Sequence, residues 1–206
     1  GGYHYSDSVI YGFSHTHLSG TGVSDYGDIL FAPTVGDIIY NNGADEKPGY
    51  SSRFSHDKEI AEAGFYQVFH EDYKIDVSLT TSHRSGFHKY TFPKSDQSNI
   101  IIDLEHRDEV LESEIEIISN NELVGFRRSK TWATDQHVYF VAQFSKDFSN
   151  AEISRAGVII DKKKVNHKML KASVQFNTDA NEDILVRVGI SAVSIASARK
   201  NLGKEI

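Results

Sequence analysis

The sequence predicts an all-β protein, an antiparallel β-sandwich of the large, super-sandwich type, and three observations support this prediction. From about residue 63 onward, apolar and polar residues alternate with a period of two, as in strands that bury one face. Turn-forming residues recur about every 10–15 residues, a spacing typical of sandwiches and barrels. The aromatic residues make up 11% of the chain and are mostly Tyr and Phe, which favour strands.

Residues 1–50 form a loop-rich segment with weak periodicity. Turn-forming groups interrupt it at 20–22, 41–43 and 47–49. Two short apolar runs, 29–31 and 38–40, are predicted to be buried strands. Ordered-looking loops of this length favour a functional surface over a linker.

The remaining strands are predicted from alternation. They follow in the order 73–79, 87–92, 100–102, 115–117, 123–127, 138–144, 170–176 and 184–193. Asn120 and Asn121 predict a hairpin turn between two of these strands. The final strand is apolar at positions on both faces, which predicts a central place in its sheet.

The C-terminal tail departs from this pattern. Ile195, Ala198 and Leu202 form an amphipathic stripe at helical spacing, and Ser194 or Ser197 is a suitable N-cap. We therefore expect a short helix over 194–204 that docks on the sandwich or leads into another domain, because an isolated helix of this length is marginal. Residues 1–206 are predicted to form one domain, and we interpret both ends as cuts in a longer protein.

Composition excludes several classes of function. The chain has 22 basic and 29 acidic residues, a formal charge of −7, and no basic stripe, which argues against nucleic-acid binding. It has no cysteine, so disulfides and thiolate chemistry are excluded. No apolar run approaches the ~20 residues of a membrane span.

One stretch near the N-terminus is long and unusual in composition. It reads Gly12-Phe13-Ser14-His15-Thr16-His17-Leu18-Ser19-Gly20-Thr21-Gly22. This stretch closely resembles the signature segment of glycoside hydrolase family 92. Weaker matches continue through 86–93 and 188–191, so the resemblance extends over the whole chain.

The resemblance implies an N-terminal β-sandwich domain that packs against a C-terminal (α/α)6 catalytic domain of the same polypeptide. Family members are calcium-dependent, inverting exo-α-mannosidases that remove α-linked mannose, often α-1,2-linked, from glycans. Their general acid and base come from the helical domain, so we expect no catalytic residue in this chain and no activity of the chain alone. The resemblance also implies that the helical domain holds most of the calcium site, with no cofactor or metal in this chain. It further implies a bacterial protein that is exported, periplasmic or at the cell surface.

His15 and His17 stand two residues apart, so on a strand they would face the same way. A zinc-type metal pair is one interpretation, and a hydrogen-bonded loop is the other. Calcium prefers oxygen ligands, so the metal of the family does not favour the first interpretation. Recognition of sugar hydroxyls and loop structure both remain open for these histidines.

Loops 3–28 are predicted to form one wall of a mannose site. The residues predicted to contact substrate are His15, His17, Ser19, Gly20, Asp25 and Tyr26. Asp25 and Asp28 have a spacing that permits a catalytic pair, but solvated loop carboxylates or turn caps are the commoner case.

His88 and His137 are predicted to be half-buried histidines whose hydrogen bonds are satisfied. The alternative function is a stand-alone carbohydrate-binding or interaction module, for which an aromatic platform of Tyr3, Tyr5, Tyr11 and Tyr26 is available.

Overall fold

The structure, a computed structural model, describes residues 3–18 and 26–206. Its elements are β1 (Val9–Ile10), β2 (Leu30–Val35), β3 (Ser52–Arg53), a 3-10 helix (His56–Lys58), β4 (Glu59–Glu62), β5 (Phe65–His70), β6 (Ile75–Thr81), β7 (Ser85–Phe92), β8 (Ser95–Asp103), β9 (Glu109–Ser119), β10 (Glu122–Lys130), β11 (Gln136–Phe144), β12 (Asn150–Arg155), β13 (Val158–Ile160), β14 (Lys164–Asn166), β15 (Leu170–Thr178), β16 (Glu182–Ser191) and α1 (Ile195–Glu205).

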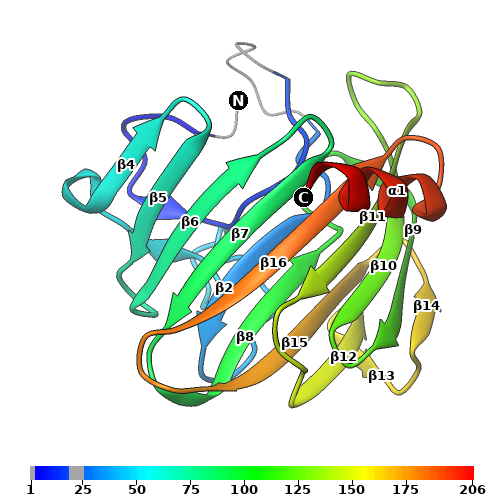
Figure 1. Ribbon diagram of the computed structural model, residues 1–206. Helices are drawn as coiled ribbons and strands as arrows, with labels where there is room; N and C mark the ends of the chain where they lie inside the picture. The colour runs from blue at the N-terminus through cyan, green and yellow to red at the C-terminus, as the bar shows by residue number, and fades with distance from the viewer. Residues whose placement is uncertain (1–2, 19–25) are drawn as a thin grey trace.

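The strands form two stacked antiparallel sheets (Figure 1). Within the described residues, the larger sheet has nine strands in the order β14-β9-β10-β11-β16-β7-β6-β5-β4. The smaller has five, in the order β13-β12-β15-β8-β2. A separate pair, β1 with β3, lies near the N-terminal loops. The predicted antiparallel sandwich is confirmed, and the single α-helix of the described residues spans 11 residues.

The core lies between the two sheets. Alternate residues of each strand point inward and pack against the inward-facing side chains of the other sheet. Phe31 and Phe176 enter from the smaller sheet, and Tyr90, Phe92 and Phe140 enter from the larger one, all fully buried. Each aromatic side chain of this kind contributes about 1.5–3 kcal/mol when removed from water, so these rings are a main source of stability.

The final strand has the central position that its sequence predicted, because β16 pairs with β11 on one side and β7 on the other. The hairpin at Asn120 and Asn121 is also confirmed, since it joins β9 to β10. The predicted strand at 38–40 is wrong. Ile38 and Tyr40 instead pack, partly buried, against Leu30, a residue of the small apolar cluster on the smaller sheet.

The predicted C-terminal helix is confirmed as α1, which docks on the outer face of the larger sheet (Figure 1). Ser194 caps its N-terminus by accepting a hydrogen bond of 3.1 Å from the backbone N–H of Ser197. Ala198 and Leu202 are buried in one cluster with Val124 and Val141.

Close seating of α1 depends on a glycine in the strand below it. A Cβ atom added to Gly189 would lie 2.5 Å from the carbonyl oxygen of Ala198 and 2.7 Å from Cβ of Leu202. Ion pairs hold the middle and the C-terminal end of the helix, because Arg199 binds Glu122 at 2.6 Å and Glu205 binds Arg84 at 2.8 Å. None of the helices in the described part of the chain is long and apolar enough to cross a bilayer.

Replacing Gly189 by alanine should push α1 off the sheet. We expect Gly189→Ala to lower the free energy of unfolding by about 1–3 kcal/mol, as overpacking against backbone does. Urea unfolding followed by tryptophan fluorescence and circular dichroism measures this change.

Gly203 provides the matched control, because a Cβ atom there meets nothing within 4 Å. Gly203→Ala should stabilise the protein by about 0.5–1 kcal/mol through the lower chain entropy of alanine. Equal stability of the two variants would show that α1 does not depend on close contact at Gly189.

Candidate functional site

Residues 13–18 and Tyr26 meet the β6–β7 hairpin and the start of β11 at one end of the sandwich. The segment 13–18 runs antiparallel to the start of β2, with paired backbone hydrogen bonds of 2.9 and 3.0 Å between Phe13 and Phe31. The N–H of His15 donates to the carbonyl of Asp28 at 3.0 Å, and Gly27 donates to Thr16 at 2.9 Å. Segment 13–18 is therefore an extended strand-like border, held in register by the main chain.

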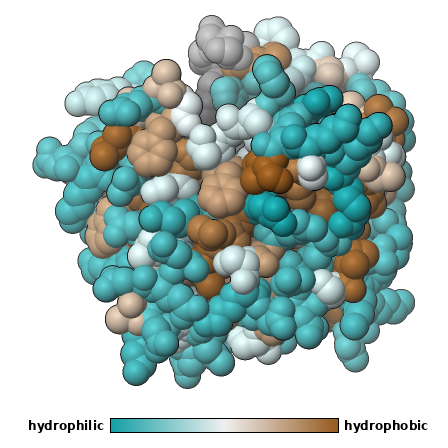
Figure 2. All heavy atoms as spheres, viewed as in Figure 1, coloured by the Kyte–Doolittle hydropathy of each residue, from teal (hydrophilic) through white to brown (hydrophobic). Residues whose placement is uncertain are grey.

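Two hollows lie on either side of segment 13–18. The larger, with a volume of about 1110 Å³, lies between this segment, the β6–β7 hairpin, the start of β11 and α1. The smaller, of about 670 Å³, lies between this segment and residues 3–12. Phe13, Ser14 and His17 line both hollows. Figure 2 shows the face that carries α1, whose hydrophilic side chains border a paler region near the upper middle.

An ion pair without solvent contact supports this end of the molecule. The Asp28 carboxylate and the Arg127 guanidinium are both fully buried and bind each other directly. Gln136 also donates to Asp28, Ser129 donates at 3.3 Å, and the hydroxyl of Thr16 donates at 2.6 Å. Four side chains thus converge on one carboxylate, and all of its charge is compensated within the fold.

Arg127 extends the same network to a second loop. Its remaining N–H groups donate to the carbonyl oxygens of Leu104 at 2.9 Å, His106 at 2.8 Å and Asp108 at 2.9 Å. The carboxylate of Asp108 in turn accepts a 3.0 Å hydrogen bond from the backbone N–H of Tyr26. Arg127 therefore joins the loop after β8 to the N-terminal loops.

The interpretation of Asp28 as a solvated loop carboxylate or a catalytic partner is wrong. Asp28 is saturated with hydrogen bonds and has no exposed surface, so it can neither exchange a proton with a substrate nor contact one. Asp25, its suggested partner, lies outside the described residues, as do Ser19 and Gly20.

The structure separates the two histidines of the predicted pair. Half-buried His15 uses both ring nitrogens within the protein, Nδ1 on the carbonyl of Ile29 at 2.7 Å and Nε2 on Nε2 of His88 at 3.1 Å. His17 is exposed, and its Nδ1 makes only a long 3.3 Å contact with the carbonyl of Leu18. Among the described residues, His17 is thus the member of the pair with a ring nitrogen available to a ligand.

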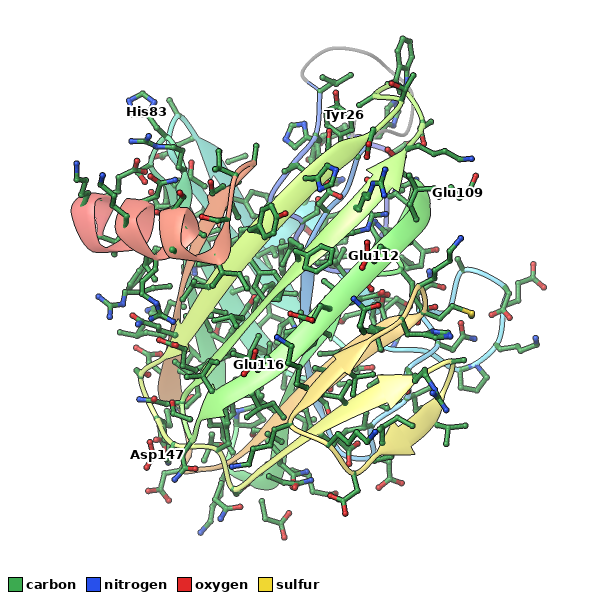
Figure 3. The ribbon with its side chains drawn as sticks, turned by 90° about the vertical axis from the view of Figure 1, so that its right-hand side faces the viewer. Tyr26, His83, Glu109, Glu112, Glu116 and Asp147 are labelled. Carbon is green, nitrogen blue, oxygen red and sulfur yellow. The ribbon has the colours of Figure 1, made fainter. Side chains whose placement is uncertain are left out.

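Tyr26 also lines the larger hollow. Its backbone has a left-handed φ of 45°, followed by Gly27 at 70° and Ile29 at 56°. Such conformations cost about 1 kcal/mol or more for residues other than glycine and persist where the surroundings hold them in place. Figure 3 shows that Tyr26 lies at the same end of the sandwich as His83 of the β6–β7 hairpin, with Asp147 at the opposite end.

The two hollows offer hydrogen-bonding groups but few carboxylates. No Asp or Glu lines the described part of the larger hollow, and Asp7 is the one that lines the smaller. Nowhere in residues 3–18 and 26–206 do three His, Cys, Asp or Glu residues group as metal ligands would. Proton transfer by paired carboxylates therefore has no support from the described residues, whereas binding of a polar neutral ligand does.

His88 is satisfied by hydrogen bonds, as predicted, but is almost fully buried, whereas His137 is half-buried beside Asp135 at 3.1 Å. Sequence reasoning missed the roles of Arg127 and Gln136. One signal was available for Arg127, which occupies the same inward phase of its strand as Leu123. A charged residue at an inward position predicts a buried partner.

His70 is a second buried histidine near segment 13–18. Its ring stacks on Phe13 with centroids 5.6 Å apart, and both ring nitrogens lack a partner in the described structure. Burial lowers the pKa of His70 to about 4, and it lowers the pKa values of His15 and His106 to about 4 as well. These side chains are therefore neutral at pH 7.

Comparison with known proteins gives consistent matches. Residues 1–191 match the model described as the glycosyl hydrolase family 92 N-terminal domain. A search of curated proteins found no match.

Among solved structures, the family 92 α-mannosidase BT3965 of Bacteroides thetaiotaomicron, solved with and without mannoimidazole, is 36% identical with a TM-score of 0.93. The family 92 hydrolase ccman5 is 26% identical over 97% of this chain and 28% of its own, with a TM-score of 0.85. The inverting mannosidase BT2199 of B. thetaiotaomicron is 22% identical over 99% of this chain and 27% of its own, with a TM-score of 0.84, which supports the fold alone. The match covers 98% of this chain but 28% of BT3965, so this chain spans less than a third of the length of that relative.

Removing the charge of Asp28 should strongly lower the free energy of unfolding. Asp28→Asn leaves the Arg127 guanidinium buried without a counter-charge, for which we expect a loss of about 3–5 kcal/mol in the free energy of unfolding. Asp135→Asn breaks an exposed pair with Arg128 and should change stability little. Urea denaturation of both variants checks this, and similar melting of the two would contradict a supporting role for the buried pair.

Stability should fall in acid because of the buried histidines. Their folded pKa values lie below the ordinary value of about 6.5, so the unfolded chain binds more protons as pH drops from about 6.5 towards 4. The contribution of these histidines to the free energy of unfolding is therefore fully present above about pH 6.5. It is lost as the pH falls from about 6.5 towards 4. His56 opposes this trend, because its hydrogen bond to Glu59 raises its pKa.

His70→Phe tests this directly. It removes two unpartnered polar atoms while keeping the stack on Phe13, so we expect about 1–2 kcal/mol of stabilisation at pH 7 and a flatter decline towards pH 5. Exposed His83→Phe is the control and should leave both quantities nearly unchanged. Urea titrations at pH 7, 6 and 5 give both values, and an unchanged pH profile for His70→Phe would refute the assignment.

Proposed function

The chain belongs to glycosyl hydrolase family 92, and from this premise we propose that it is the N-terminal domain of an exo-α-mannosidase and forms one wall of the substrate site. The observation that carries the proposal is the larger hollow, bounded by segment 13–18 and Tyr26, with polar groups and no carboxylate among its described lining residues. Such a surface can bind a neutral sugar, but its described lining residues include no pair of carboxyl groups for inverting hydrolysis.

The chemistry then belongs to a second domain. Hydrolysis with inversion requires a carboxylic acid and a carboxylate ~6.5–9.5 Å apart, with room for a water molecule between them. We propose that a helical (α/α)6 domain of the same polypeptide provides both groups, and that loops 3–28 help to close the site around terminal α-linked mannose of glycans. α-1,2 linkages are the proposed preference, from family resemblance alone.

Within this chain, the proposed sugar contacts are His17 and Tyr26, together with Ser19, Gly20 and Asp25 of the undescribed segment. The exposed imidazole of His17 can donate or accept one hydrogen bond to a mannose hydroxyl. His15 takes the structural role, because both of its ring nitrogens are already engaged.

Calcium is proposed for the whole enzyme but not for the described part of this chain. The ion takes six to eight oxygen ligands, mainly carboxylates and carbonyls. Asp28, the fully buried carboxylate at this end, is consumed by its protein partners, and the described residues contain no group of three His, Cys, Asp or Glu that could hold a metal ion, so the donor set does not fit. We also propose that the protein is exported by a bacterium, to the periplasm or cell surface, where polymeric glycans are met.

A stand-alone carbohydrate-binding module is the second candidate. Tyr5 is 73% exposed and stacks on His56 with centroids 4.3 Å apart and ring planes 9° apart, a flat platform of the kind a pyranose can cover. Tyr11 and Tyr26 are half-buried and would add less. The two candidates differ in one outcome, which is whether the domain is needed for catalysis by a second domain.

The chain alone should release no mannose from α-mannosides. Without the general acid and base it lacks proton transfers that each contribute about 10²–10⁴-fold in rate. Incubation of the purified chain with 4-nitrophenyl α-mannoside and with α-1,2-mannobiose, in the presence of calcium, measures this. Turnover that survives repurification and disappears in a variant of a residue in this chain would place the chemistry here instead.

A chimera tests the proposed role more sharply. This chain should replace the corresponding domain of BT3965 and keep α-mannosidase activity, because the two share 36% identity over nearly all of this chain. In the chimera, His17→Ala should lower kcat/KM by about ten- to a hundredfold, the effect of leaving one sugar hydroxyl unpaired, with the calcium requirement unchanged.

Lys162→Ala, an exposed residue between β13 and β14, is the control and should keep full activity. A folded chimera with no activity would contradict the assignment of the domain. Wild-type kinetics in His17→Ala would remove His17 from the site.

A further inference from the structure

A continuous line of hydrogen bonds connects the core to segment 13–18. Tyr90 and His88 stand two residues apart on β7 and share one face of the strand. The Oη of Tyr90 lies 2.7 Å from Nδ1 of His88, and Nε2 of His88 lies 3.1 Å from Nε2 of His15. Nδ1 of His15 then reaches the carbonyl of Ile29 at 2.7 Å.

The last acceptor fixes the direction of every bond in this line. A backbone carbonyl can only accept, so Nδ1 of His15 carries the proton. A neutral imidazole has one N–H, which leaves Nε2 of His15 as an acceptor, and His88 must donate to it through Nε2. Nδ1 of His88 is then an acceptor and takes the O–H of Tyr90. One tautomer of each histidine satisfies every group, and no other neutral arrangement does.

The surroundings hold the two rings in this arrangement. The imidazoles of His15 and His88 stack with centroids 5.0 Å apart and planes inclined by 20°. Phe31 packs on both rings, at 5.3 and 5.6 Å. Gly86 leaves the necessary space, because a Cβ atom there would lie 3.1 Å from His15 Nε2 and 3.3 Å from His88 Nε2.

Neutrality of the pair is consistent with its burial. Tyr90 has no exposed surface and His88 is 5% exposed. Burial lowers the pKa of both His15 and His88, and the neighbouring His15 lowers the pKa of His88 further. The charged groups nearest along the chain, Arg84 and Lys89, are turned to other partners, Glu205 and Asp183.

We propose that His88 and Tyr90 are positioning residues, which lock His15 in its Nδ1-protonated form and thereby fix segment 13–18 at the wall of the larger hollow. His17 is carried by the same segment, two residues beyond His15. The two histidines thus have different roles. His15 anchors segment 13–18, and His17 contacts the sugar. The kinetic consequence rests on the proposed function, whereas the tautomers are properties of this chain alone.

Two-bond ¹H–¹⁵N correlation spectra of the chain labelled with ¹⁵N-histidine at pH 7 test the tautomers. We expect His15 as the Nδ1–H form and His88 as the Nε2–H form, each in one state. The opposite tautomer at either position, or averaging between the two tautomers, overturns the proposal.

Three variants separate positioning from simple packing. His88→Gln keeps an N–H donor near the place of Nε2, whereas His88→Met fills similar space without a donor. His15 should stay in its Nδ1–H form in the Gln variant and become a mixture of tautomers in the Met variant. Tyr90→Phe should give His88 mixed tautomers, and Tyr139→Phe on the outer face of the sheet should change neither histidine.

In the active chimera, His88→Met should lower kcat/KM about tenfold, the cost of one lost buried hydrogen bond, and His88→Gln should restore it to within about threefold of wild type. Urea unfolding shows whether each variant is folded at the assay temperature. If His88→Met does not fold, Tyr90→Phe gives the same comparison, with a loss in kcat/KM and mixed His88 tautomers.

Equal kinetics for His88→Gln and His88→Met, with a single His15 tautomer in both, would overturn the positioning role. An inactive wild-type chimera whose tautomers are as expected would refute the proposed function and leave this assignment intact.

Discussion

The end of the sandwich that carries the candidate site depends on one buried ion pair, Asp28 with Arg127. A pair without solvent contact gains little net stability relative to apolar side chains, since both ions lose their hydration. Its effect is geometric. Asp28 has a fixed place among four donors, and Arg127 reaches three carbonyls of the loop after β8. Loops that are far apart in sequence are thereby forced into one arrangement.

Segment 13–18 is held by two networks, which are this ion pair and the hydrogen-bonded line of Tyr90, His88 and His15. Thr16 is held by Asp28 from the side of the loops, and His15 is held by His88 from the side of the core. Alternate residues of an extended segment point in opposite directions, so each of the two networks can reach its own residue. His17, two residues beyond His15, lines both hollows. Segment 13–18 is therefore held at two successive residues, and His17 follows them at the wall of the hollows.

The sequence allowed most of the fold to be predicted, because alternation reports directly on half-buried strands such as the run from Tyr73 to Leu79. It failed at Ile38–Tyr40, where apolar residues cover the outside of a sheet without joining one. The family motif directed attention to segment 13–18, which borders the two hollows. It could not distinguish His15 from His17, nor show that Asp28 is buried, because both depend on side chains 70 to 100 residues away, His88 and Arg127, whose approach only the folded chain determines.

The central place of β16 has a consequence for how the chain folds. This strand is the last of the described strands, yet it closes the larger sheet by joining β7, about a hundred residues earlier, to β11. Until it arrives, the sheet exists as two halves with open edges that can pair with other chains. Contacts over such sequence distances form slowly. During synthesis from the N-terminus, the larger sheet therefore cannot close until β16 has been made, and the open edges of β7 and β11 are exposed until then.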